Sequence, residues 1–247
     1  KSLLITLGIG FFYIFGTDGI LYAIGISYLG YAKVLYESFK TSKKDFKFFR
    51  EHFGFIINDY FMGIINVGRS QIDKLIIAPL LGFALLGNYS LALQVVMGLT
   101  IFPNVIFKFL LPEEAEQKSN KKLKFFAIFI SACISICGVV LTPVILPEIF
   151  PKYSDAVDAI RIMSLAVIPI TLNLIFTSQL LGLEKSKFVL IGRLIALFTT
   201  SVLTITLGMS YGMIGLAIAF LLTSIVQTSV SAYANYHMKK DEESLST

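Results

Sequence analysis

Long apolar runs, separated by short polar stretches, dominate the pattern along this chain. A helix needs about 20 mostly apolar residues to cross a membrane, and on that measure the runs form eight candidate spanning segments. The segments are Leu3–Phe15, Gly19–Tyr36, Phe53–Pro79, Ala84–Leu111, Phe125–Thr142, Ala156–Leu183, Phe188–Gly208 and Ile214–Tyr236. The proline-rich stretch Pro143–Tyr153 predicts an irregular or re-entrant loop. The pattern therefore predicts an all-α, polytopic membrane bundle of about eight transmembrane helices.

Composition agrees with this class. Hydrophobic residues make up 55% of the chain and charged residues 15%, with a mean hydropathy of +0.78, whereas soluble domains carry about 25% charged residues. The chain begins with Lys1 inside an apolar run. We therefore expect it to be the later part of a longer protein whose N-terminal part is missing.

Basic residues concentrate in alternate connections, after the second, fourth, sixth and eighth segments. The other connections, around Thr17-Asp18, Phe83–Asn88, Leu146–Asp155 and Ser210-Tyr211, hold one lysine, Lys152. By the positive-inside rule, the lysine-rich loops and the C-terminus are cytoplasmic, and we expect a multi-pass protein of the cell membrane. The net charge of +5 thus reflects topology, and its spread over four loops argues against a nucleic-acid partner.

The connector Lys40–Phe55 is both basic and aromatic. It either lies on the inner leaflet, with phenylalanines in the interface and lysines near anionic lipid, or is a plain cytoplasmic linker. The sequence leaves both open.

Two hairpin turns share one pattern. Phe15-Gly16-Thr-Asp-Gly19 opens the second segment and Tyr211-Gly212-Met-Ile-Gly215 opens the eighth, and in both an alanine follows four residues after the second glycine. Each pattern predicts a tight turn followed by a small face that allows close helix packing. A repeat in the same orientation indicates two parallel halves; the alternative is that such turns are simply common in membrane hairpins.

Polar residues recur on one face of the third segment. Asp59, Asn66 and Asp73 are seven residues apart and Arg69 lies beside them, which places them on one helical stripe. This stripe either lines a cavity for polar cargo or holds the bundle together through an Arg69–Asp73 pair. We favour the cavity for Arg69, and structural roles for Asp73 and for Lys74, which can snorkel to water.

A second polar stripe, Arg193, Thr200 and Thr204, lies on the seventh segment and could contact phosphate and sugar. The alternative is that Arg193 snorkels to the inner interface. Arg161, another cavity candidate, has Asp158 three residues before it and can pair with it locally.

Two amides and two prolines lie deep in apolar segments. Asn173 and Gln179 predict hydrogen bonds between helices rather than ligand contacts. Pro103 and Pro169 predict kinks.

Several of these residues are similar to the signature of oligosaccharide flippases of the polysaccharide-biosynthesis, O-antigen-export type. The similar features are an Asp-Lys pair near a helix end, a Leu-Gly, and then Gly-x-Tyr-Ser-x-Ala. Here they are Asp73, Lys74, Gly82, Gly87 and Tyr89, together with the later stretches 149–156 and 211–217. Pro151 stands where the family often has glycine. The resemblance spans nearly the whole chain, although no single motif in it is diagnostic.

The resemblance implies a superfamily of multidrug and lipid-intermediate exporters built from two six-helix bundles. On that map residues 1–38 end the first bundle, 39–52 form a basic cytoplasmic linker, 53–236 form the six-helix second bundle, and 237–247 form a cytoplasmic tail.

The function implied is flipping of lipid-linked oligosaccharide by alternating access. Membrane lipid and other glycan-assembly membrane proteins are the implied partners, and ion coupling stays open, with Asp59 as the acidic candidate. The alternatives are a cation-coupled multidrug exporter of the same superfamily and a non-transporting scaffold. We find no motif for catalysis, a metal or nucleotide hydrolysis, and expect neither enzymatic activity nor a cofactor.

Overall fold

The computed structural model describes residues 2–41, 53, 64, 68, 71–116, 120–183 and 185–245. Every element within these ranges is a helix, which confirms the all-α class. The chain divides into two compact units, residues 1–58 and 59–247. Asp59, Asn66 and Arg69, and most of the connector Lys40–Phe55, lie outside the described residues.

The first unit contains a hairpin of α1 (Ser2–Phe15) and α2 (Thr17–Thr41). Gly16 forms the turn with a φ of +63°, a conformation that glycine adopts without steric cost. A Cβ atom on Gly19 would lie 2.0 Å from the carbonyl oxygen of Phe11. Glycine at position 19 therefore lets the two helices touch backbone to backbone.

The same geometry recurs in α10 (Ser186–Leu245), which consists of two arms joined at Gly212. Gly212 has a φ of +56°, and a Cβ on Gly215 would lie 1.9 Å from the carbonyl oxygen of Leu207. Both hairpins thus follow one pattern. A first glycine turns the chain with a positive φ, and a second glycine, three residues later, packs against the backbone carbonyl of the preceding helix. The predicted glycine turns are thus confirmed.

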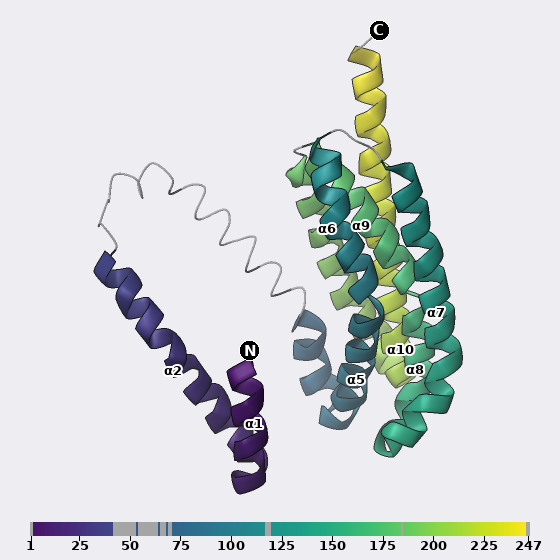
Figure 1. Ribbon diagram of the computed structural model, residues 1–247. Coiled ribbons are helices and arrows are strands. Elements are labelled where there is room, and N and C mark those ends of the chain that lie inside the picture. Colours follow the sequence, from purple (N-terminus) through teal and green to yellow (C-terminus); the bar gives the residue numbers. More distant parts are fainter. Residues whose placement is uncertain are drawn as a thin grey trace. The chain divides into compact units, whose positions relative to one another are not determined.

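The second unit is built around a broken central helix (Figure 1). Besides α10 and the helical residues 71–81, the described part of this unit contains α5 (Phe83–Leu99), α6 (Ile101–Ala115) and α7 (Lys121–Ile149). The central helix consists of η1 (Pro151–Ala156), α8 (Val157–Ser164) and α9 (Val167–Gly182). α8 packs against α5, α7 and α10, and α9 packs against α6, α7 and α10. Ile160 and Met163 of α8 are fully buried as a result.

Two helices bend where a proline follows. The pair α5 and α6 bends by 46° at Thr100, and the pair η1/α8 and α9 bends by 41° between Ser164 and Val167. Pro103 and Pro169 lie in the first turn after each bend. Because a proline ring clashes with the carbonyl four residues earlier, each kink lies one turn before its proline. The predicted kinks are confirmed.

The predicted loop Pro143–Tyr153 is wrong over most of its length. α7 continues through Pro143 and Pro147 to Ile149, because prolines are tolerated in membrane helices whose surroundings satisfy the freed backbone groups. The predicted turn Phe83–Asn88 is also wrong, since α5 begins at Phe83 and the turn reduces to Gly82, with a φ of +88°.

Two described helices are long and apolar enough to cross a membrane, α7 and residues 186–237 of α10, or up to four if each bent pair is one span. This count is below the predicted eight. One reason is that 186–237, with 52 residues, would extend about 78 Å, more than twice the roughly 30 Å hydrocarbon core, and it folds back at Gly212. Another is that most of the third predicted segment lies outside the described residues.

Large apolar side chains cover the outer face of α7. Phe125, Phe129, Ile136, Val140 and Val144 are each more than half exposed. A continuous apolar face of this kind is expected where a helix meets lipid. Together with the candidate spans, it indicates a membrane location.

The backbone contact at Gly215 gives a first prediction. We expect Gly215→Ala to destabilise the protein by about 1–3 kcal/mol, the range for overpacking, because the neighbouring carbonyl of Leu207 has to move. Gly98→Ala is the matched control, since Gly98 lies in α5 with nothing within 4 Å of its Cβ position. Thermal unfolding in detergent measures both, and equal stability of the two variants would contradict the proposed close approach.

Candidate functional site

The charged cluster at the start of the second unit contains a buried hydrogen bond. Residues 71–81 are helical, Gly82 turns the chain, and α5 returns alongside. The Tyr89 hydroxyl donates to Asp73 Oδ2 over 2.7 Å, and the backbone N–H of Lys74 donates to Asp73 Oδ1 over 2.9 Å. Asp73 is 7% exposed and Tyr89 2%. A carboxylate removed from water needs such donors, so Tyr89 gives Asp73 a partner within the fold.

The surroundings of this pair are a closed apolar core. Ile77 and Tyr89 belong to a buried cluster that also contains Met163 of α8 and Leu216 of α10. Gly87 lies against the ring of Tyr153, whose Cε1 is 4.0 Å from the position of a glycine Cβ. Four of the five predicted motif residues, Asp73, Gly82, Gly87 and Tyr89, thus shape one hairpin and its contacts, while Lys74 is half-buried beside them.

The second predicted stripe lies on the first arm of α10. Thr204 is buried, whereas Arg193 and Thr200 are half-buried. The Thr200 hydroxyl donates to the Ala196 carbonyl over 2.8 Å, so its remaining capacity is to accept hydrogen bonds. The stripe therefore combines a guanidinium, which can bind a phosphate with two parallel hydrogen bonds, with hydroxyl oxygens.

Arg161 is not brought to this stripe. It lies on α8 with its side chain 47% exposed, and its Nη1 is 3.3 Å from Asp158 Oδ1. The predicted local pair of Arg161 and Asp158 is therefore confirmed. Exposed pairs of this kind contribute little to stability.

The predicted amide contacts are also confirmed, and their partners lie on the second arm of α10. Asn173 accepts a hydrogen bond from the Ser231 hydroxyl over 2.8 Å, and Gln179 accepts one from the Asn235 amide over 2.5 Å. We call these two pairs the α9–α10 ladder. Thr228 extends it by donating to the Pro169 carbonyl over 2.7 Å. The α10 partners were not predicted from the sequence, although polar residues recur at helical spacing from Ser224 to Asn235.

An ion pair at the far end of the bundle was also missed. Lys124 Nζ at the start of α7 lies 2.5 Å from Glu114 Oε1 at the end of α6, and both side chains are 12% exposed. Gly182 packs against the backbone of Glu114. The acidic residues Glu113, Glu114 and Glu116, directly before a lysine-rich loop, were the signal that pointed to such a pair.

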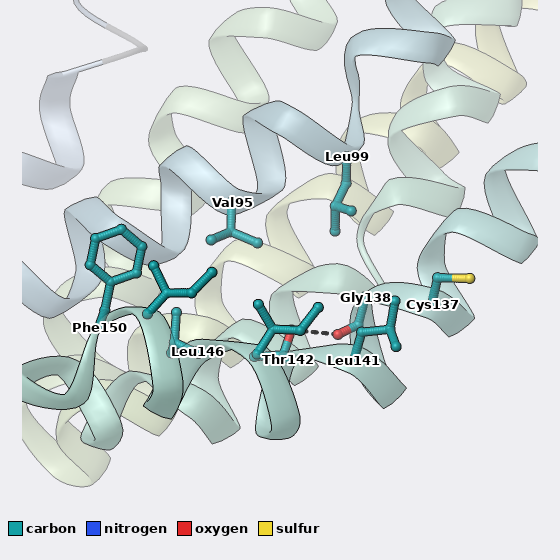
Figure 2. A pocket seen from close by; sticks show the side chains of 10 residues that line it. Val95, Leu99, Cys137, Gly138, Leu141, Thr142, Leu146 and Phe150 are labelled. Atoms are coloured by element: carbon teal, nitrogen blue, oxygen red, sulfur yellow. Dashed lines mark hydrogen bonds between the residues drawn. The ribbon is translucent and has the colours of Figure 1, made fainter.

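A lipid-facing groove runs between α5 and α7, which we call the α5–α7 groove (Figure 2). Figure 2 shows Val95 and Leu99 of α5 opposite Leu141, Thr142 and Leu146 of α7. The lining is Val95, Leu99, Cys137, Gly138, Leu141, Thr142, Ile145, Leu146, Ile149 and Phe150, and the volume is about 270 Å³. The Thr142 hydroxyl donates to the Gly138 carbonyl over 2.5 Å. Since its one hydroxyl is bonded within α7, the groove is suited to an apolar occupant.

Comparison of the chain with protein-family models, with curated proteins and with solved structures found no match.

The buried Tyr89–Asp73 contact gives a second prediction. We expect Tyr89→Phe to lower the free energy of unfolding by about 1–2 kcal/mol, because the carboxylate loses a hydrogen-bond donor at a buried position. Tyr211→Phe is the control, since Tyr211 is 67% exposed and its hydroxyl is dispensable for packing. Denaturant unfolding in detergent compares the two variants. An equal decrease in the free energy of unfolding in both would contradict a stabilising role for the Tyr89–Asp73 hydrogen bond.

Proposed function

We propose that the protein is a membrane transporter that flips a lipid-linked oligosaccharide, a polyprenyl-phosphate or -pyrophosphate glycan, across the cell membrane. Two helical bundles alternate between inward and outward opening, and the C-terminus is cytoplasmic. The glycan serves the synthesis of a surface polysaccharide or glycoconjugate.

One observation carries this proposal. The three stretches that resemble the flippase signature, 71–92, 149–156 and 211–217, are far apart in sequence but contribute to one buried cluster. Tyr89 and Ala92 come from the first stretch, Ala156 from the second, and Leu216 and Ala217 from the third. Motifs that meet in a single core act as one structural unit, and this supports treating the resemblance as a shared fold rather than three coincidences.

The chemistry of the cargo also fits the polar residues of the chain. The phosphate of the carrier requires a persistent cation, and arginine offers a planar, bidentate donor. Arg193, with Thr200 on the same helical face, provides the cation and a hydroxyl for sugar contacts. Arg69 and Asn66, which lie outside the described residues, stay sequence-based candidates for the same cargo, and Asp59 is the candidate for ion coupling.

A cation-coupled multidrug exporter of the same superfamily is the second candidate. It would require acidic groups in its cavity for organic cations. Arg161 pairs with Asp158, which leaves Arg69 and Arg193 against the acids Asp59 and Asp73, and Asp73 accepts a hydrogen bond from Tyr89. Because Asp73 is already hydrogen-bonded to Tyr89, only Asp59 remains as an acid for a cationic cargo, and the charge distribution favours an anionic cargo. A non-transporting scaffold would need none of these intramembrane charges.

The third prediction tests transport directly. In vesicles containing a fluorescent lipid-linked oligosaccharide, a membrane-impermeant reductant bleaches the outward-facing label, and the rate of label loss measures flipping. We expect Arg193→Ala to slow flipping roughly tenfold or more, because loss of a charge-assisted hydrogen bond costs about 1.5–3 kcal/mol. Arg69→Ala should act in the same direction.

Two controls accompany this assay. Arg193→Lys keeps the charge but loses the bidentate geometry, so an intermediate rate is expected. Lys187→Ala removes an exposed cation six residues earlier on the same helix and should leave flipping unchanged. Full rates in both arginine-to-alanine variants would reject the cationic cavity, while loss of organic-cation efflux on Asp59→Asn would favour the multidrug exporter.

A further inference from the structure

The α5–α7 groove is open along its length to the surroundings of the bundle. Leu141, Ile145, Ile149 and Phe150 line it, and each is between 44% and 61% exposed. In a membrane such side chains meet lipid chains, because hydrocarbon replaces water around the protein. An occupant can therefore enter the groove sideways from the bilayer.

The shape of the groove restricts what it can hold. The lining residues of α7 and the residue after it run from Cys137 to Phe150, which is about 20 Å along the helix. Its volume of about 270 Å³ lies below the roughly 300–1,000 Å³ of sites for drug-sized ligands. A long and narrow groove between two helices fits one hydrocarbon chain rather than a ring system or a glycan.

A cation lies just beyond one end of the groove. Lys152 follows two residues after Phe150, in the exposed part of η1. Among the residues that the structure describes, none forms an ion pair with Lys152, although Glu148 and Asp155 are near it in sequence. A lysine near the membrane surface attracts anionic lipid by about 1 kcal/mol.

We propose that the α5–α7 groove holds the polyprenyl chain of the lipid carrier in the outer leaflet, with the carrier's phosphate beside Lys152. The identity of the carrier and the orientation of this end rest on the proposed function. A single unbranched groove suits a lipid with one chain. A glycerophospholipid has two chains, so the second would stay outside the groove and gain nothing from it.

The absence of tryptophan from the chain allows a selective test. Phe150→Trp places one reporter at the mouth of the groove, and Phe83→Trp places one on an 80% exposed position outside it. Both replace one aromatic ring with another. Each variant of the full chain is reconstituted in phosphatidylcholine whose acyl chains are brominated, so that any acyl chain in contact quenches the fluorescence.

Unbrominated polyprenyl phosphate is then added at a low mole fraction. For Phe150→Trp we expect relief of quenching well above the fraction of lipid replaced, because the polyprenyl chain displaces a brominated chain from the groove. For Phe83→Trp we expect only the relief due to dilution. Adding Lys152→Gln to the Phe150→Trp protein should weaken the preference about fivefold, which corresponds to the loss of about 1 kcal/mol.

Two further lipids decide the outcome. Phosphatidic acid at the same mole fraction carries the same phosphate monoester on two chains and should give only dilution, and polyprenol lacks the phosphate and should compete more weakly. Equal relief by phosphatidic acid would overturn the assignment to the carrier, and equal relief at both reporters would overturn the groove as a site. Neither result bears on flipping, since the measurement requires no transport. Conversely, preferential relief together with unaffected flipping in the arginine variants would retain the groove and reject the proposed cavity.

Discussion

The breaks in the two bent helices constrain the rest of the second unit, because lipid offers no hydrogen bonds to backbone groups released at a kink. At the central break, the Ser164 carbonyl accepts from the Ser135 hydroxyl of α7 over 3.0 Å. At the other, the Thr100 carbonyl keeps its helical partner, the Asn104 backbone N–H, over 3.1 Å and also accepts from the Asn104 side-chain amide over 2.8 Å. Both kinks converge on Gly138 of α7, where a Cβ would lie 2.7 Å from Ser164 Oγ and 2.8 Å from Leu99 Cδ1. One glycine therefore sets how closely both bent helices approach α7.

In lipid, polar contacts between helices contribute to the association that apolar burial drives in water. Lipid chains are as apolar as leucine, so association of helices relies on close packing and hydrogen bonds. The α9–α10 ladder connects α9 to one neighbour, and the Thr171 hydroxyl connects it to Ser131 of α7 over 2.7 Å. The helix contacts of the bundle thus include polar pairs beside its apolar clusters, whereas its outer face is apolar. That distribution explains why the buried residues include many serines and threonines.

Local features were predictable from the sequence, and features that depend on the position of a turn were not. Gly212 and Gly215 act through their own backbone, so their spacing alone predicts a hairpin. Pro143 and Pro147 suggested a loop because proline inside a helix costs about 3 kcal/mol in water, but α7 accommodates both. The Tyr89–Asp73 contact joins residues 16 positions apart, and it follows only once the turn is known to be Gly82 alone rather than 83–88.

The separation of polar and apolar surfaces bears on the kind of cargo that this bundle could handle. The Thr142 hydroxyl in the α5–α7 groove is bonded within α7, and the stripe containing Arg193 and Thr200 offers a cation and a hydroxyl. A wholly polar solute would make no favourable contact with the groove. A compact organic cation would be repelled by Arg193. On the proposed function, a molecule with an anionic, hydroxylated head and one long hydrocarbon chain would make favourable contacts with both surfaces. Because the chain can remain in lipid while the head crosses, the two surfaces need not adjoin.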